Sequence, residues 1–147
     1  RTAFLQALQA AATDVHRSGR GFAVLYVDLD GFKPVNDRYG HAVGDQLLVW
    51  VARQLTQAAR EDDAVARLGG AEFALLQRGR VRLADRLVQA LGRPTEIEAH
   101  ALQIGASIGI VLSPGDGTEA EELLRKADSA MYLAKATGRG CARIYGT

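Results

Sequence analysis

Apolar residues recur at helical spacing in four stretches of the chain. Intervals of three and four residues place such side chains on one face of a helix, which can then pack against a core. The predicted helices cover residues 2–17, 41–60, 81–92 and the stretch from Thr118 to about Thr137. Thr118 and Glu121 have the spacing of a capping box, and Gly138 is a natural residue to follow the end of that helix. A short polar segment before residue 41 contains Pro34, which fits a helix only in its first turn.

Other stretches have the patterns of β-strands. The run FAVLYV at 22–27 is apolar throughout, which predicts a strand buried on both faces near the middle of a sheet. The stretch 102–112 alternates instead, and its small residues such as Ser107 and Gly109 share a face that something could approach closely. Three shorter strands are predicted at 64–69, 72–77 and 141–146. The first two flank a glycine pair and therefore predict a β-hairpin.

Strands and helices alternate along the 147 residues without repeats or a linker. This order predicts a single α/β (α+β) domain over 1–147, with a mixed, mostly antiparallel sheet flanked by helices. The net charge of +1 provides no overall attraction to nucleic acid or to a membrane surface. Cys141 is the only cysteine, which excludes a disulfide framework and a cysteine-based metal site.

The sequence has no segment that addresses or anchors the chain. No apolar run approaches the roughly 18 residues that a transmembrane helix needs, and no signal peptide is recognisable. The chain begins at Arg1, inside a helical pattern, so we expect it to be a piece of a longer multidomain protein. We expect the domain to lie in the cytoplasm, and leave open whether its parent protein is anchored in a membrane.

Asp28 and Asp30 follow directly on the buried strand. The carboxyl end of such a strand is where open α/β sheets usually bind ligands, and carboxylate oxygens are preferred by Mg²⁺. Asp30 has an equally good structural explanation, because it could cap the following helix. Asp28 has a weaker one, since a carboxylate on a buried strand is not needed for packing.

Two further groups of polar residues lie at helix ends. His41 and Asp45 share a face at the start of a predicted helix, and with Asn36 they could read the edge of a purine base. Lys135 and Arg139 are likewise four residues apart, near the end of the last helix, and could contact phosphates. The helix dipole alone also explains an acid at the start of a helix and bases at the end.

The order of these groups is more specific than any one of them. The segments DLDGFKPVNDRYGHAVGD, RLGGAEF and AMYLAKATGRG together resemble the GGDEF family of diguanylate cyclases, and the resemblance covers nearly the whole chain. It implies a fold akin to the polymerase palm and the adenylyl cyclase core. It also implies an activity that joins two GTP molecules into cyclic di-GMP, with two Mg²⁺ per site and one GTP on each domain of a homodimer.

The resemblance assigns roles to individual positions. The metal ligands would be Asp28 and the carbonyl of Leu29. The triphosphate would contact Lys33, Lys135 and Arg139. The guanine pocket would consist of Asn36, His41 and Asp45. Gly69 and Gly70 would form the hairpin that lets the backbone approach the nucleotide, which glycine allows.

The family signature is altered at Ala71. The family has an acidic residue there, which holds the metals and helps to deprotonate the attacking 3′-hydroxyl. Losing several kcal/mol of metal stabilisation would slow the reaction roughly a hundredfold to ten-thousandfold. Glu72 is retained, but on a strand its side chain points to the opposite face and should not substitute. We therefore expect weak Mg²⁺ binding; the sequence does not distinguish a natural Ala71 from an engineered one.

Arg60 and Asp63, in the segment REDD, lie just before the hairpin. In the family an R-x-x-D at this place marks the inhibitory site that binds the product, cyclic di-GMP. The alternative is a charged loop between a helix and a strand.

Three hypotheses follow. The chain is a regulatory module that binds GTP or cyclic di-GMP, a weak or inactivated diguanylate cyclase, or a scaffold for dimerisation. The retained guanine and phosphate positions argue against the scaffold, and Ala71 argues against the active enzyme. The segment DLDGFKPVND is similar to family members fused to a cyclic di-GMP phosphodiesterase domain, in which the cyclase-like domain senses GTP. We expect sensor or phosphodiesterase domains outside this chain.

Overall fold

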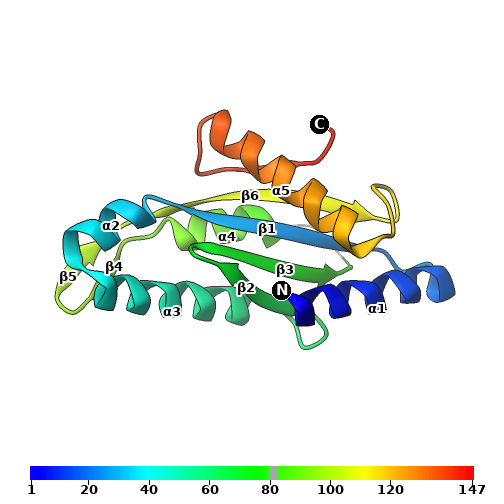
Figure 1. Ribbon diagram of the computed structural model, residues 1–147, viewed down its shortest axis with the longest axis horizontal. Coiled ribbons are helices and arrows are strands. Elements are labelled where there is room, and N and C mark those ends of the chain that lie inside the picture. Colours follow the sequence, from blue (N-terminus) through cyan, green and yellow to red (C-terminus); the bar gives the residue numbers. More distant parts are fainter. Residues whose placement is uncertain (80–82) are drawn as a thin grey trace.

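The computed structural model describes residues 1–79 and 83–147. Its main sheet has the strand order β2-β3-β1-β6-β7 (Figure 1). These strands are β1 (Phe22–Asp30), β2 (Ala64–Gly69), β3 (Glu72–Arg78), β6 (Gly105–Ser113) and β7 (Ala142–Ile144). Neighbouring strands are antiparallel except for β6 and β7, which are parallel. The predicted α+β fold with a mostly antiparallel sheet and a hairpin is therefore confirmed.

Strand β1 lies in the middle of the sheet, as its apolar run predicts. Its first six residues are buried because β3 and β6 cover both edges and helices cover both faces. The strand continues beyond the run to Asp30. In this register Asp28 lies opposite Glu72 on one side and Ser107 on the other, so three polar side chains share one face of the sheet.

Helices cover the two faces of the sheet (Figure 1). Side chains of α1 (Thr2–Ser18) and α5 (Ala120–Ala136) join Val24 and Tyr26 in one apolar cluster. Those of α3 (His41–Ala58) and α4 (Leu83–Leu91) join Leu25 and Val27 in the other. The short helix α2 (Phe32–Tyr39) follows β1, and β4 (Thr95–Ile97) pairs with β5 (His100–Leu102) as a separate hairpin. Because side chains alternate along a strand, Asp28 and Asp30 lie on the α5 face.

The small face of β6 is occupied by helix α5. A Cβ atom on Gly109 would collide with the backbone of α5 at Ala127 and Met131. The close approach expected from the sequence is therefore made by the protein's own helix at this position.

The structure corrects one predicted helix start and confirms most of another predicted helix. The predicted capping box at Thr118 is wrong by one residue: the N-cap of α5 is Glu119, whose carboxylate accepts a hydrogen bond of 2.6 Å from the amide of Glu122. Helix α4 confirms most of the helix predicted over 81–92, while residues 81 and 82 lie outside the described residues. No helix in the described part of the chain is long and apolar enough to cross a membrane.

Candidate functional site

Asp30 joins three segments that are far apart in the sequence. Its carboxylate accepts hydrogen bonds from the Ser107 hydroxyl at 2.9 and 3.0 Å, from Lys135 Nζ at 3.1 Å and from the Gly140 amide at 2.9 Å. Arg139 adds an ion pair at 3.7 Å. Asp30 does not cap α2, whose N-cap position is Gly31 and has no side-chain cap bond. The structural alternative considered for Asp30 is thus wrong, because its carboxylate holds β6 and the end of α5 instead.

Asp28 shares the same lysine. Lys135 Nζ lies 3.4 Å from Asp28 Oδ2, and both side chains are about one-fifth exposed. Burial raises the pKa of the Asp28 carboxyl, and the neighbouring Lys135 ammonium partly opposes that rise. A single ammonium therefore compensates two carboxylates at the end of β1.

Glu72 is engaged on the same face. The Tyr26 hydroxyl donates a hydrogen bond of 3.0 Å to Glu72 Oε1. Burial, and then this hydrogen bond, raise the pKa of Tyr26 above its ordinary value. Asp128 of α5 is affected too: burial and the nearby Asp28 carboxylate raise its pKa. The α5 face at this end of the sheet thus carries several carboxylates, and those of Asp28 and Glu72 are already paired with Lys135 and Tyr26.

Ala71 lies on the other side of the strand end. It is half-buried and packs against the α3–α4 cluster, while its carbonyl accepts a hydrogen bond of 3.1 Å from the Leu29 amide. Arg67 Nε donates to the Gly70 carbonyl at 3.0 Å and so closes the glycine hairpin. The expectation that positions 71 and 72 face opposite sides agrees with these contacts.

The donor set does not fit a stable pair of divalent metals. Within residues 1–79 and 83–147, no three His, Cys, Asp or Glu side chains are grouped so that they could hold a metal ion. Asp30 is engaged by four partners, and Asp28 is paired with Lys135. Only Asp28 and the Leu29 carbonyl remain as candidate ligands, which is too few oxygens for a Mg²⁺ cage of six ligands.

The candidate guanine residues meet at the junction of α2 and α3. Asn36 Nδ2 and His41 Nδ1 are 3.0 Å apart. The Asn36 side-chain oxygen occupies the space that a Cβ atom on Gly44 would need, so Gly44 lets Asn36 pack closely against α3. Asp45 is the next residue and is exposed. The structure thus brings these three predicted site residues to one corner.

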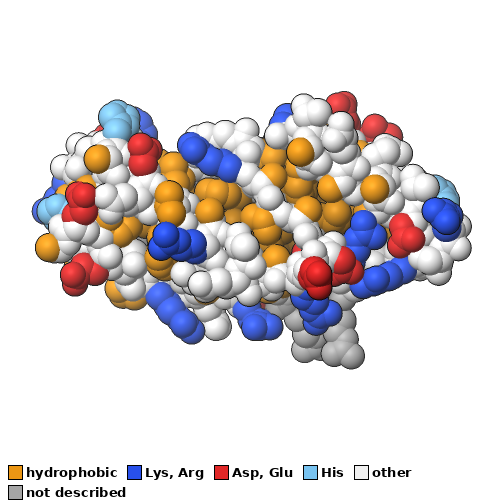
Figure 2. All heavy atoms as spheres, turned by 90° about the horizontal axis from the view of Figure 1, so that it is seen from below, with side chains coloured by type: hydrophobic (Ala, Val, Ile, Leu, Met, Phe, Trp, Pro, Cys, Tyr) orange, Lys and Arg blue, Asp and Glu red, His pale blue; other side chains and the backbone are white. Residues whose placement is uncertain are grey.

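A pocket of about 360 Å³ opens beside this corner. It lies between α3 and the glycine hairpin and is lined by Asp45, Leu48, Val49, Ala52, Arg67 and Phe73. Figure 2 looks at the face that carries α3, where apolar side chains gather between Lys and Arg side chains. The sequence analysis did not single out Arg67, although it lies only two residues before Gly69.

Lys33 stands apart from the carboxylates. Its ammonium lies 3.8 Å from Asp37 Oδ2, one turn along α2, and its side chain is 86% exposed. Lys33 is therefore free to reorient toward a ligand, but the structure does not join it to Lys135 or Arg139.

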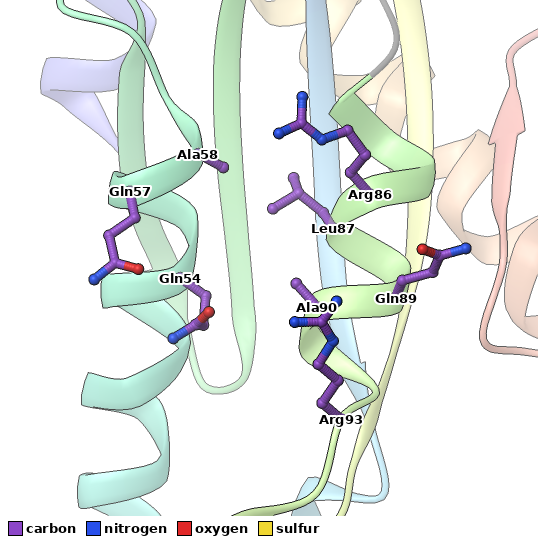
Figure 3. Close-up of a pocket in the computed structure, with 8 residues that line it drawn as sticks. All are labelled: Gln54, Gln57, Ala58, Arg86, Leu87, Gln89, Ala90 and Arg93. Atoms are coloured by element: carbon purple, nitrogen blue, oxygen red, sulfur yellow. The ribbon is translucent and has the colours of Figure 1, made fainter.

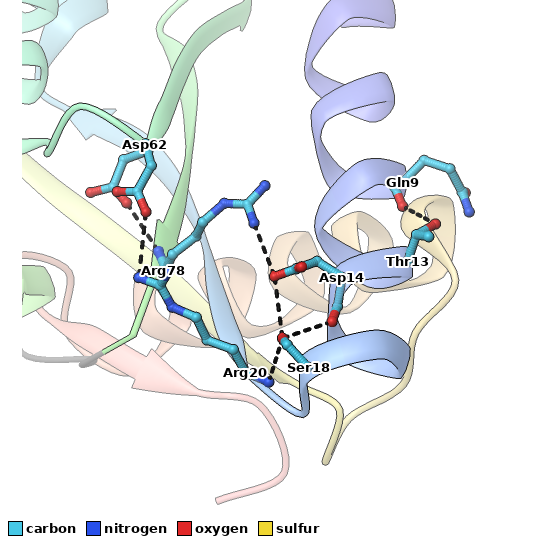
Figure 4. A network of polar contacts seen from close by, with 8 residues as sticks. Gln9, Thr13, Asp14, Ser18, Arg20, Asp62 and Arg78 are labelled. Carbon is cyan, nitrogen blue, oxygen red and sulfur yellow. Dashed lines mark hydrogen bonds and ion pairs between the residues drawn. The ribbon is translucent and has the colours of Figure 1, made fainter.

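The Asp63 carboxylate holds the loop that contains Arg60. Asp63 accepts hydrogen bonds from the Arg60 amide at 2.9 Å and the Arg78 amide at 3.0 Å. Ion pairs Arg20–Asp62 at 3.4 Å and Arg78–Asp14 at 3.6 Å connect this region to the end of α1 (Figure 4). Asp63 therefore shapes the loop, and the Arg60 side chain is exposed.

A polar groove of about 380 Å³ lies between α3 and α4. Figure 3 shows Arg86 directed across it toward the C-terminal end of α3, which leads to Arg60. Arg93 lines the same groove. The sequence analysis did not single out either arginine: Arg86 lies in α4, and Arg93 lies two residues beyond its end.

The five-stranded, mostly antiparallel sheet with helices on both faces is an α+β fold of the palm-like type. The model of the family "Diguanylate cyclase, GGDEF domain" matches residues 1–141, so the chain belongs to the GGDEF family. Over 137 residues it is 49% identical to the bifunctional diguanylate cyclase/cyclic di-GMP phosphodiesterase MucR of Pseudomonas aeruginosa, covering 90% of this chain and 20% of MucR. It is 38% identical to the diguanylate cyclase TpbB of the same species, over 98% of this chain and 35% of TpbB.

Solved structures agree with this assignment. The GGDEF domain of TpbB superposes with a TM-score of 0.95 at 37% identity, covering 100% of this chain and 96% of that one. The GGDEF domain of DgcB from Caulobacter crescentus, in complex with c-di-GMP, gives 0.90 at 26% identity, covering 100% and 91%. The chain spans only a fifth to a third of the curated relatives MucR and TpbB, so it corresponds to one part of each of them.

Proposed function

We propose that this chain is a regulatory GGDEF domain that binds GTP at the α2–α3 corner and cyclic di-GMP at the Arg60 loop, with little or no cyclase activity. The observation that carries the proposal is the contrast between Ala71, which has no carboxylate to offer, and the intact corner of Asn36, His41 and Asp45. The domain 1–147 would act within a longer cytoplasmic or membrane-anchored protein, next to sensor or phosphodiesterase domains.

The impaired reaction follows from charge and geometry. Cyclisation needs a 3′-hydroxyl to lose a proton and phosphate charge to be stabilised. The Ala71 side chain can neither accept that proton nor hold a metal that stabilises the phosphate charge. Glu72 is engaged with Tyr26 on the α5 face. A metal brought by the nucleotide would find only Asp28 and the Leu29 carbonyl, so Mg²⁺ binding is weak and the rate falls by about two to four orders of magnitude.

Binding needs less than catalysis. The Asp45 carboxylate can accept from guanine N–H groups, and the Asn36 amide can both donate and accept. Lys135 has three N–H donors, of which the contacts to Asp28 and Asp30 use two. The third donor, together with Arg139 and the exposed Lys33, provides cationic groups for a triphosphate.

The Arg60 loop is proposed as a second site. Its guanidinium can form two parallel hydrogen bonds to a guanine edge or a phosphate. The groove with Arg86 and Arg93 adds positive charge near the same loop. The complex of the related DgcB domain with c-di-GMP supports the choice of ligand.

A weakly active diguanylate cyclase is the second candidate. It is favoured by the identity of the chain to MucR and TpbB, both described as diguanylate cyclases. Two domains would have to meet face to face as a homodimer, each holding one GTP.

Calorimetry of the domain with GTP and with cyclic di-GMP, each with and without Mg²⁺, tests the proposal. We expect both nucleotides to bind, and Mg²⁺ without nucleotide to bind weakly. Failure of both nucleotides to bind would contradict the regulatory function, and rapid turnover of GTP in the same samples would favour the enzyme.

A further inference from the structure

The β4–β5 hairpin has an unusual turn. Its two turn residues, Glu98 and Ala99, have φ angles of +51° and +67° although neither is glycine. Left-handed backbone is unfavourable for such residues and persists only where the surroundings enforce it. The hairpin is anchored by Leu102 at its base and by Ile97 beside the turn, which are 3% and 7% exposed within the α3–α4 cluster.

Two contacts join the tip of this hairpin to the corner between α2 and α3. The Gln46 side-chain amide donates a hydrogen bond of 2.7 Å to Glu98 Oε1. The rings of Tyr39 and His100 are stacked with centroids 4.6 Å apart and a tilt of 40°. Figure 1 shows β4 and β5 beside α2 and the first turn of α3. One contact therefore reaches each of the two helices.

These contacts lie next to the candidate guanine residues. Tyr39 follows Asn36 by three residues in α2, and Gln46 follows Asp45 directly in α3. The Asn36–His41 contact at 3.0 Å links the same two helices from within. A change in the angle between α2 and α3 would therefore separate the amide and the carboxylate that read the base.

We propose that the β4–β5 hairpin sets the base specificity of the corner, with Glu98 and His100 as positioning residues for Asp45 and Asn36. Neither residue touches the nucleotide. Each holds one of the two helices, so that the carboxylate and the amide are spaced for guanine, including its exocyclic amino group. This inference rests on the proposed binding of GTP at the corner.

A hairpin with only a structural role makes a different prediction. Losing Glu98 or His100 would then lower the stability of the fold, and any loss of affinity would be equal for all purine nucleotides. A positioning role changes the ratio of affinities for different bases. A misplaced Asp45 no longer accepts a hydrogen bond from the guanine amino group, which hypoxanthine lacks. The ratio of GTP affinity to ITP affinity therefore separates the two roles.

The experiment measures GTP and ITP affinities of the domain by calorimetry, with melting temperatures as a fold check. We expect the unchanged chain to prefer GTP by at least about tenfold, as for a hydrogen bond to a charged acceptor. His100→Ala and Glu98→Ala should each reduce this preference by about threefold or more. His100→Phe keeps an aromatic ring on Tyr39 and should preserve it. His16→Ala is the matched control, since His16 is exposed on α1.

The outcomes are distinguishable. An unchanged GTP-to-ITP ratio in both alanine variants overturns the inference but leaves the proposed function standing. An equal loss of the preference for GTP in His100→Phe or His16→Ala has the same consequence. If the unchanged chain binds no GTP, the proposed function fails and the inference fails with it. If an alanine variant melts early, its ratio is measured below its own transition, where the folded fraction cancels between the two nucleotides.

Discussion

The Lys135 ammonium lies 3.4 Å from the Asp28 carboxylate, on the face of the sheet that α5 covers. Asp30 receives the same ammonium at 3.1 Å. The site therefore balances much of its charge with its own side chains.

Restoring the acidic residue should restore some catalysis. We expect Ala71→Asp to raise cyclic di-GMP synthesis from a barely detectable rate, by roughly a hundredfold or more if the metal stabilisation returns. The measurement is product formation from GTP with Mg²⁺, in two domains joined as a forced dimer, with Ala71→Asn as the uncharged control. Robust synthesis by the unchanged chain would show that position 71 is dispensable. No gain in the dimer would indicate a second defect, first at Gly140, where the family often has Asn.

Asp30 should contribute to the stability of the fold, because its carboxylate joins β1 to β6 and to the end of α5. Asp30→Asn removes the charge that Lys135 and Arg139 contact, and the Lys135 ammonium, on a side chain that is 21% exposed, keeps only the pair with Asp28 among the described residues. We expect the free energy of unfolding to fall by about 1–3 kcal/mol, measured by urea denaturation. Asp37→Asn serves as control: its side chain is 67% exposed and its only ion pair in the described chain is with Lys33, so a change within about 0.5 kcal/mol is expected. Equal effects of the two changes would refute the structural role of Asp30.

Stability should depend on pH through Asp128. Its pKa in the folded chain is raised above the ordinary 3.8 by burial and by Asp28. The folded state therefore holds its proton to higher pH than the unfolded state, and stability decreases as pH rises through the range above 3.8. Relative to the unchanged chain, Asp128→Asn should gain stability as the pH rises above 3.8, in urea denaturation at stepped pH.

The same comparison in an Asp28→Asn background provides the control. Without the Asp28 charge, part of the cause of the shift is absent, so the pH-dependent advantage of Asp128→Asn should shrink. An advantage that stays constant across this pH range in the unchanged background would contradict the raised pKa.

Arg60 should serve one ligand only. Arg60→Ala should weaken cyclic di-GMP binding by roughly fivefold to hundredfold, the range for a lost bidentate contact to guanine, and leave GTP binding nearly unchanged. Calorimetry with both nucleotides checks this, with the exposed Arg17→Ala on α1 as control. If cyclic di-GMP affinity is untouched, the segment REDD is only a charged loop.

Local patterns predicted most of the fold because they report local causes. The apolar run at 22–27 identified the central strand, since a strand covered on both faces has no polar alternation to keep. The capping box at Thr118 was wrong by one residue, because Glu119 caps α5 although Glu is not among the residues usually favoured at that position. Such a choice is made by tertiary contacts that the local pattern does not contain.

The candidate site was only partly predictable. Helix geometry alone places His41 and Asp45 on one face of α3. Asn36 belongs to α2 and reaches them through the turn at Gly40 and its contact with His41. The role of Asp30 was missed because its partners Ser107, Lys135 and Gly140 lie 77, 105 and 110 residues away in the chain. The groove arginines and Arg67 carried no motif that separates them from solvated helix or strand residues.

Gly109 has a consequence for the whole phosphate end of the domain. Every other amino acid carries a Cβ atom, which at this position would meet the α5 backbone. The helix that carries Lys135 is therefore seated on bare main chain and has almost no room to slide or roll over the sheet. Under the proposed function, a signal arriving from a neighbouring domain would therefore move α5 and the sheet together as one rigid unit.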